Sequence, residues 1–307
     1  MSRILITGGS GLIGQELCKL LHRQGFDPIL LSRNPSKIKD WTAFEWDLKR
    51  GWVDPQLFNQ PIDYLIHLAG AGIADARWTD KRKRLIVKSR SQSLDVLAQA
   101  FREAGQELKA FISASAVGIY GDRGNEVLDE SSAIHEERKN DFLIQSCIAW
   151  EEAAKAFHGL SARITHLRIG IVLSTQGGAL AKMLPSYQFH LGAYFGSGEQ
   201  YYPWVHIEDL CRMFLFLLEK GKMGVYNGVG PDPVQNKTMA RILAKATNKK
   251  SLILPAPEFA LRLAMGEMAN VVLYSARALP KRLEEEGFQH RYRDLQAALE
   301  DLLERKL

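Results

Sequence analysis

The feature that most constrains the fold of this chain is its first stretch, MSRILITGGSGLIG. The apolar run Ile4–Ile6 predicts a short buried strand, and the apolar spacing of Leu12–Leu21 predicts a helix. Between and within them, Gly8, Gly11 and Gly14 recur at every third position. Without side chains at the first two, the backbone can turn sharply and let a pyrophosphate approach the helix N-terminus, where unpaired N–H groups favour anions. The stretch therefore predicts a dinucleotide-binding turn, with a purely structural glycine turn as the alternative.

The third glycine of this turn, Gly14, is expected to let the helix sit close to the sheet. The residues predicted to contact the cofactor here are Gly8, Ser10, Gly11, Leu12, Ile13 and Gly14.

Length and composition exclude several classes of protein. At 307 residues the chain exceeds a usual single core, so one large α/β unit with an added lobe, or two domains, is expected. The apolar start is too short for a signal peptide and no stretch approaches a membrane span, which predicts a soluble, cytoplasmic protein without membrane partners. The three cysteines are far apart and lack CxxC spacing, so neither a disulfide framework nor a metal site is expected.

The basic run DKRKRLIVKSR, residues 80–90, carries much of the modest net charge of +5. Because the run continues into a helical pattern, we interpret it as a solvated helix face and expect no nucleic-acid partner.

Strand-like and helical runs alternate through the first half of the chain. The predicted strands are Ile4–Ile6, Pro28–Leu31, Ala43–Trp46, Tyr64–His67, Ala110–Ser113 and Ile164–Leu167. The predicted helices between them are Leu12–Gln24, Thr79–Ala104 and Asp141–Phe157. This alternation predicts an α/β fold, a Rossmann-like doubly wound parallel sheet covered by helices on both faces, with ligands at the carboxyl ends of its strands.

The end of the second predicted strand indicates which dinucleotide is bound. An NAD site would carry Asp or Glu here to hold the ribose 2′-hydroxyl, but the nearest acid, Asp27, precedes the strand. Ser32 and Arg33 stand there instead, and a guanidinium can bind the 2′-phosphate of NADP(H) through two N–H donors. A solvated loop arginine is the alternative.

The third and fourth predicted strands end in further candidate contacts. Asp47 could accept a hydrogen bond from the adenine amino group, or cap the turn that follows it. The small residues in HLAGAG would let the cofactor backbone pass over the strand end, and packing is the alternative. The candidate contacts in that segment are Leu68, Ala69 and Gly70.

The fifth predicted strand ends in SASAVGIYG, which offers candidate catalytic hydroxyls. Ser115, and secondarily Tyr120, could polarise a substrate carbonyl beside a nicotinamide ring. Serine is also a common turn former, so both interpretations stay open at this point.

The second half of the chain predicts a substrate-side lobe. After the sixth strand we expect a long irregular passage in which GAYFGSGEQYYPW forms a lip over the substrate. Helices at Ile207–Leu218, Lys237–Thr247, Pro257–Ala269 and Tyr292–Glu304 and a strand at Val225–Asn227 are predicted to follow. The candidate pocket residues are Arg168, Tyr201, Trp204 and His206, with packing and junction roles as alternatives.

These patterns predict two units. Residues 1–170, with 203–228 returning to them, form the NADP-binding domain, and residues 171–202 and 229–307 form a smaller, mostly helical C-terminal lobe. The apolar run Val271, Val272 and Leu273 fits either the pocket wall or a second copy of the chain, so a homodimer stays open.

With its glycine turn, HLAG, the serine-rich strand end and PWVHIEDL, the chain resembles the extended short-chain dehydrogenase/reductases of the NAD(P)-dependent epimerase/dehydratase superfamily. It is similar in particular to an atypical group called epimerase family proteins, which has its own C-terminal domain of unknown function. The segments that carry this closer resemblance are RWTDKRK, SASAVGIYGDRG, DFLIQSCIAWEEAA, LRIGIVLS, PAPEFALRLAMGEMA and LPKRLEEEGFQHRY. The resemblance implies bound NADP(H) and a lobe that closes over a small-molecule substrate.

The chain departs from that family at the residues that move protons. The resemblance implies a Tyr-x-x-x-Lys pair on the helix after the fifth strand, but its positions hold Leu143 and Cys147, and no such pair occurs in the chain. An asparagine of the preceding helix is also missing, with Ser89 as its counterpart. Two hypotheses follow, an NADP(H)-dependent oxidoreductase with another proton donor, or a non-catalytic NADPH-binding sensor. Epimerisation of a nucleotide sugar, which normally needs the same tyrosine, is not expected.

Overall fold

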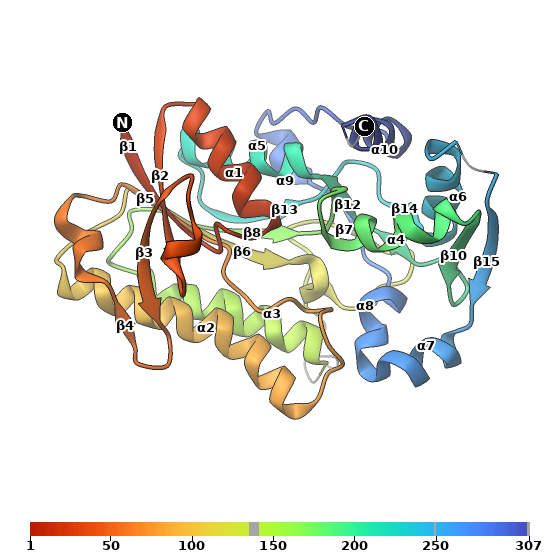
Figure 1. The fold of residues 1–307 in the computed structure, drawn as a ribbon, viewed down its shortest axis with the longest axis horizontal. Helices are drawn as coiled ribbons and strands as arrows, with labels where there is room; N and C mark the ends of the chain where they lie inside the picture. The colour runs from red at the N-terminus through yellow and green to blue at the C-terminus, as the bar shows by residue number, and fades with distance from the viewer. Residues whose placement is uncertain (135–140, 249, 306–307) are drawn as a thin grey trace.

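The computed structural model describes residues 1–134, 141–248 and 250–305. Its centre is an eight-stranded sheet in the order β13-β8-β6-β5-β1-β2-β3-β4 (Figure 1). The strands are β1 (Ser2–Thr7), β2 (Phe26–Ser32), β3 (Thr42–Asp47), β4 (Trp52–Val53), β5 (Tyr64–His67), β6 (Ala110–Ala116), β8 (Ile164–Ile169) and β13 (Gly224–Gly228). All neighbouring pairs are parallel except β3 and β4. The predicted Rossmann-like parallel sheet is confirmed.

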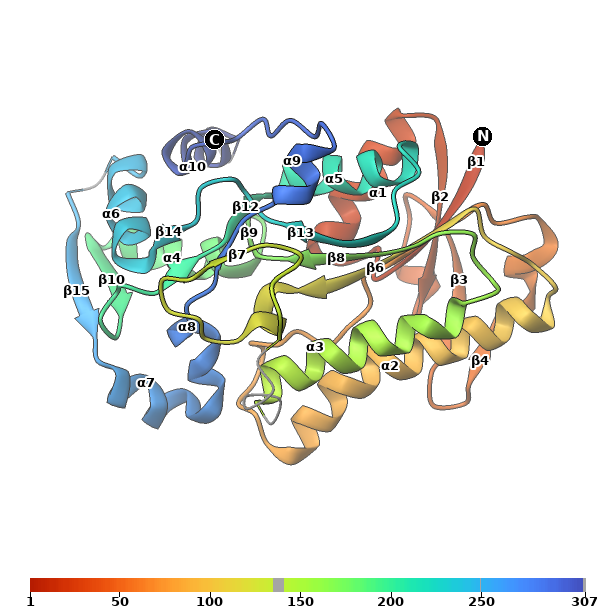
Figure 2. The same ribbon diagram turned by 180° about the vertical axis from the view of Figure 1, so that it is seen from behind.

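Helices cover both faces of this sheet (Figures 1 and 2). One face carries α1 (Leu12–Arg23) and α5 (Ile207–Glu219), and the other carries α2 (Asp80–Glu103) and α3 (Phe142–Ala153). The strands are therefore buried on both sides, and successive side chains of one strand enter different cores. In β1, Ile4 and Ile6 belong to the core beneath α1 and α5, whereas Leu5 belongs to the core beneath α2 and α3.

Most of the remaining elements form the region to one side of the sheet (Figure 1). The helices are α4 (Gly178–Gln188), α6 (Asn236–Ala246), α7 (Glu258–Met265), α8 (Asn270–Leu273), α9 (Lys281–Glu285) and α10 (Leu295–Glu304). The short strands pair as β7 (Val127–Leu128) with β16 (Arg277–Ala278), β9 (Ile171–Leu173) with β12 (Trp204–His206), β10 (Leu191–Phe195) with β15 (Leu252–Ala256), and β11 (Tyr201–Tyr202) with β14 (Val234–Gln235). None of the described helices is long and apolar enough to cross a membrane.

The passage after the sixth predicted strand is more regular than expected. Instead of a long irregular segment it contains β9, α4 and β10. Leu180, Leu184 and Tyr187 are buried at helical spacing along α4. The flanking glycines and Pro185, which lies inside the helix, hid that spacing.

Three predicted helices begin or end elsewhere for local reasons. The helix α3 stops at Ala153 and continues as a 3₁₀ turn over Ala154–Phe157. The helix α7 stops before Gly266, whose φ of +62° favours glycine. The last helix, α10, begins only at Leu295, behind its capping residue Asp294.

The segment before α10 returns to the sheet region. The Asp209 carboxylate on α5 accepts hydrogen bonds from the backbone N–H groups of Arg291 (3.0 Å) and Tyr292 (2.9 Å). Nearby, the Tyr226 hydroxyl on β13 donates to Glu286 at 2.9 Å. The last part of the chain thus completes the surroundings of α5 and β13.

Candidate functional site

The predicted cofactor residues lie along one edge of the sheet, at the carboxyl ends of β1, β2, β3 and β5. The register pairs Thr7 at the end of β1 with Leu31 of β2 on one side and with His67 of β5 on the other. Because the chain proceeds outward from β1 in both directions, this is the switch point at which open α/β sheets bind ligands. The structure therefore brings the predicted dinucleotide contacts together.

The glycine turn packs directly on the end of β5. Gly8 has φ +70°, and a Cβ there would lie 2.8 Å from the carbonyl carbon of Leu68. A Cβ on Gly14 would lie 2.5 Å from both the Gly8 oxygen and the Gly9 Cα. Gly14 was expected to let the helix lie close to the sheet. The contact that it allows is with the turn at Gly8 and Gly9. A side chain at Gly8 or Gly14 would clash with the backbone of the chain itself, so the turn requires glycine at these two positions.

The candidate cofactor residues at the ends of β2 and β3 differ in their hydrogen bonds and ion pairs. Arg33 is exposed and forms no ion pair with any residue that the structure describes. Ser32 Oγ accepts a hydrogen bond from Asn34 N at 3.1 Å. Asp47 Oδ1 accepts from the N–H of Lys49 at 2.8 Å, which is the expected turn-capping role. The contact of Asp47 with adenine stays a prediction.

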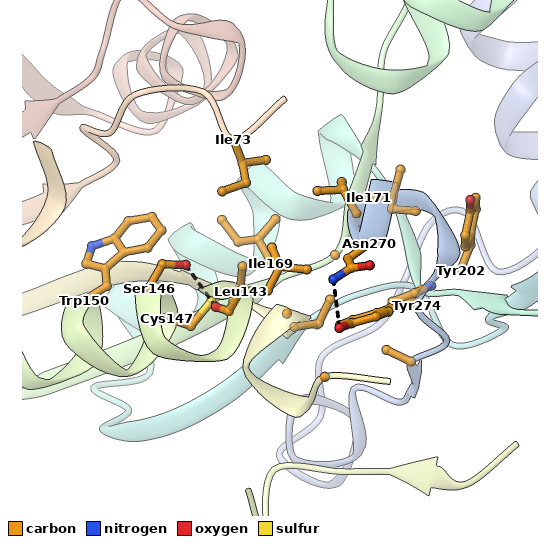
Figure 3. A pocket seen from close by; sticks show the side chains of 18 of the residues that line it. Ile73, Leu143, Ser146, Cys147, Trp150, Ile169, Ile171, Tyr202, Asn270 and Tyr274 are labelled. Carbon is orange, nitrogen blue, oxygen red and sulfur yellow. Dashed lines mark hydrogen bonds between the residues drawn. The ribbon is translucent and has the colours of Figure 1, made fainter. Parts of the chain in front are cut away.

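A cavity of about 210 Å³ opens between α3, the end of β6 and the C-terminal region (Figure 3). Its walls are mainly apolar, and the described lining contains no Lys, His, Asp or Glu. The lining residues are Ile73, Arg90, Ala116, Val117, Gly118, Gly121, Leu143, Ser146, Cys147, Trp150, Ile169, Gly170, Ile171, Tyr201, Tyr202, Pro203, Asn270, Val271, Tyr274 and Ala276. An apolar wall with few polar groups is typical of a small-molecule site.

Tyr274 provides a polar group at one end of this cavity (Figure 3). Its hydroxyl accepts a hydrogen bond from Asn270 Nδ2 at 2.9 Å and donates to the Asp141 carboxylate. The other oxygen of Asp141 accepts from Leu143 N at 2.8 Å and so caps α3. A single carboxylate thus joins the start of α3 to the C-terminal region.

Other polar groups of the lining are engaged or inert. The Tyr202 hydroxyl donates to the Val272 carbonyl at 2.6 Å, and burial raises its pKa. Ser146 donates to the Leu143 carbonyl at 2.9 Å. Burial raises the pKa of the Cys147 thiol to about 12, so it is protonated at neutral pH and is not a nucleophile.

The predicted catalytic hydroxyl of Ser115 points away from the cavity. It donates to Glu151 Oε1 at 2.8 Å, and its neighbour Ala116 lines the cavity instead. Successive side chains of a strand face opposite sides, so a shift of one position decides which of the two meets a ligand. Ser115 thus does not line this cavity, and its catalytic role stays a prediction.

Arg168 and Tyr120 belong to the same buried network. Arg168 donates to both oxygens of Glu151, from Nε at 2.8 Å and from Nη2 at 2.9 Å, and to the Tyr120 hydroxyl at 3.1 Å. The Tyr120 hydroxyl in turn donates to Asn227 Oδ1 at 2.9 Å. Neither Arg168 nor Tyr120 lines the cavity, and the roles predicted for them stay predictions.

Of the other predicted pocket residues, Tyr201 lines the cavity, whereas Trp204 and His206 lie in the core. Trp204 is fully buried and donates from Nε1 to the Asp232 carbonyl at 2.7 Å. His206 caps α5, with its Nδ1 accepting from Glu208 N at 3.1 Å. Both have the packing and junction roles considered as alternatives.

Three residues of the cavity, Arg90, Asn270 and Tyr274, were absent from the sequence-based prediction. A signal existed for Arg90, since it falls four residues after Ile86 and four before Leu94, both of which are buried. It therefore lies on the inner stripe of α2 rather than on a solvated face. No comparable signal links Tyr274 to Asp141, which is 133 residues away.

Comparisons with known proteins agree with this architecture. Residues 4–230 match the model of the NAD dependent epimerase/dehydratase family, and residues 256–302 match a domain of unknown function, DUF1731. An epimerase family protein of Staphylococcus aureus is 35% identical over 306 residues, 99% of each chain. The epimerase family protein YfhF of Bacillus subtilis is 35% identical over 303 residues, covering 98% of this chain and 97% of its own.

Among solved structures, the human epimerase family protein SDR39U1, crystallised with NADPH, is similar to this chain with a TM-score of 0.86 and 29% sequence identity. The similarity covers 98% of this chain and 99% of the human one.

Proposed function

The chain belongs to the NAD dependent epimerase/dehydratase family, and we propose that it is an NADP(H)-dependent oxidoreductase acting on a small carbonyl or hydroxyl compound. The observation that carries this proposal is that an apolar cavity at the end of β6 and a glycine turn at the end of β1 lie on the same carboxyl edge of the sheet. The glycine turn fits a pyrophosphate, because its backbone is bare where side chains would clash. Arg33 fits the 2′-phosphate that distinguishes NADP(H), and the human relative was crystallised with NADPH.

Bound NADP(H) would supply or accept a hydride. The turn at Gly8–Gly14 and Arg33 would hold the dinucleotide. The apolar cavity walls would keep water from the reacting carbon, and on substrate binding the Tyr274 hydroxyl would redirect its proton from the Asp141 carboxylate to a substrate oxygen. In this proposal the two units divide the work, with residues 1–170 and 203–228 binding the cofactor and residues 171–202 and 229–307 enclosing the substrate.

The function is tested by absorbance, following NADPH oxidation with small aldehydes and ketones and NADP⁺ reduction with small hydroxy compounds. We expect slow, saturable turnover of at least one apolar member of the panel. The exposed-surface variant Arg84→Ala should leave that turnover unchanged. Tight NADPH binding without turnover of any compound in the panel would contradict the proposed oxidoreductase activity.

The second candidate is a sensor of the NADPH/NADP⁺ balance. It is favoured by the described cavity lining, which has Leu143 and Cys147 where the family pair is expected and lacks any Lys or carboxylate. Its test is a physical partner whose binding changes with the redox state of the bound nucleotide, in protein that turns over no substrate.

Tyr274 offers a direct test of the site. Replacing Tyr274 by Phe keeps the ring but removes the hydroxyl, so turnover should fall by about 100-fold, the lower end of what a positioned proton donor contributes. NADPH affinity should stay within about twofold of wild type, because the phenyl ring still fills the space of the tyrosine ring in the cavity wall. Both quantities are measured by steady-state kinetics and calorimetry.

Asp141→Asn probes the same contact from its other side. It keeps a hydrogen-bonding group at the cap of α3 while removing the charge that Tyr274 contacts. Unchanged turnover in Tyr274→Phe would show that another group meets the substrate oxygen.

A further inference from the structure

Arg90 on α2 is a half-buried cation that lines the cavity. Its guanidinium lies 4.8 Å from the centre of the Trp150 ring, and its Nη1 donates to the Ile86 carbonyl of its own helix at 2.9 Å. No carboxylate that the structure describes forms an ion pair with it. The contrast is Arg168, whose guanidinium is matched by both oxygens of Glu151.

Burial of a guanidinium costs free energy unless acceptor oxygens compensate for the lost water. Burial also lowers the pKa of Arg90. The guanidinium keeps its charge at neutral pH, because arginine is not deprotonated in proteins. A ligand that brings oxygen atoms to this position would relieve that cost.

The position of Arg90 along the sheet edge indicates which ligand this is. A Cβ on Gly70 would lie 3.0 Å from Arg90 Cζ, and a Cβ on Gly8 would lie 2.8 Å from the Leu68 carbonyl carbon. The glycine turn and Arg90 therefore border the same short loop after β5, two residues apart. A dinucleotide that ran from the glycine turn toward the cavity would pass the Arg90 guanidinium.

We propose that Arg90 binds the nicotinamide half of NADP(H), donating hydrogen bonds to its phosphate and ribose oxygens where the cofactor enters the cavity. This inference rests on the cofactor of the proposed function but not on its turnover. The planar guanidinium presents several N–H donors at once. Its contact with the Trp150 ring already restricts the Arg90 side chain, so binding a ligand costs less conformational entropy. The family resemblance implies a lysine on α3 at the position of Cys147, whose thiol is neutral. The cation at this place in the cavity would therefore come from Arg90 on α2.

The test compares two ligands by calorimetry, in the full-length protein and without substrate. NADPH carries both halves of the dinucleotide, whereas adenosine 2′,5′-bisphosphate lacks the nicotinamide half. Arg90→Ala should weaken NADPH binding by about 10- to 100-fold and change bisphosphate binding by less than about twofold. Arg90→Lys keeps the charge without the planar fork and should fall between wild type and Arg90→Ala.

Arg84→Ala, an exposed position on the same helix, is the control and should bind both ligands as wild type does. Equal weakening of both ligands by Arg90→Ala, or of neither, would overturn the proposal. Unchanged NADPH affinity with a raised KM for a carboxylate-bearing substrate would also overturn it, assigning Arg90 to the substrate. Wild-type protein that binds neither ligand would overturn both this inference and the proposed function, so the two failures are distinguishable.

Discussion

Replacing Glu151 by Gln is expected to lower the free energy of unfolding by about 3 kcal/mol, because it leaves the Arg168 guanidinium buried without its counter-charge. The side chains of Arg168 and Glu151 are only 8% and 15% exposed. Glutamine keeps the size of the side chain, so the loss reports charge rather than a cavity. Urea unfolding followed by circular dichroism measures it.

The matched control is the neighbouring residue, Glu152. It pairs with Lys155 at the surface, where both side chains are 58% exposed. Glu152→Gln should cost less than about 0.5 kcal/mol, as is usual for exposed pairs. Equal losses in the two variants would contradict the buried network.

The same pair predicts how stability depends on pH. Burial raises the pKa of Glu151, but the hydrogen bonds and charge of Arg168 lower it by more than burial raises it. The pKa of Glu151 in the folded protein is therefore below its ordinary value. A carboxyl whose folded pKa is lowered stabilises the protein above the unfolded pKa of about 4.3, and this contribution is lost as the pH falls through the folded pKa. The stability difference between wild type and Glu151→Gln should therefore shrink below about pH 4. A difference that stays constant with pH would exclude the charge as its source.

The second large effect is expected at Arg33. Arg33→Ala should weaken NADPH binding by about 10- to 100-fold and leave NADH binding nearly unchanged, because only NADPH carries the 2′-phosphate. Calorimetric titration with the two nucleotides measures both affinities. Arg33→Lys keeps the charge but not the bidentate geometry, so it should recover part of the loss. Equal loss for both nucleotides would exclude this role for Arg33.

Sheet topology was predictable from sequence because it depends on short-range patterns. Apolar runs of strand length alternate with helical spacing, and parallel strands bring their carboxyl ends to one edge. Arg33 and Gly70, far apart in the chain, could therefore be placed at the same edge from sequence alone, and the structure brings them there.

The side-chain content of the cavity was harder to predict. Ser115 and Ala116 are neighbours on β6, so their side chains point to opposite faces of the sheet. The sequence alone does not show which of the two faces the cavity. Arg90 was interpreted as solvated because its neighbours are basic, although its spacing from Ile86 follows the buried stripe. The contact of Tyr274 with Asp141 depends on how the C-terminal region packs against α3, and no local pattern encodes that packing.

The return of the last segment to α5 and β13 has a consequence for biosynthesis. Asp209 obtains its backbone donors from Arg291 and Tyr292, and Tyr226 obtains its carboxylate partner from Glu286. A nascent chain that has emerged only as far as β13 still has the Asp209 carboxylate without these donors. The native surroundings of α5 and β13 are therefore complete only after residue 292 has left the exit tunnel.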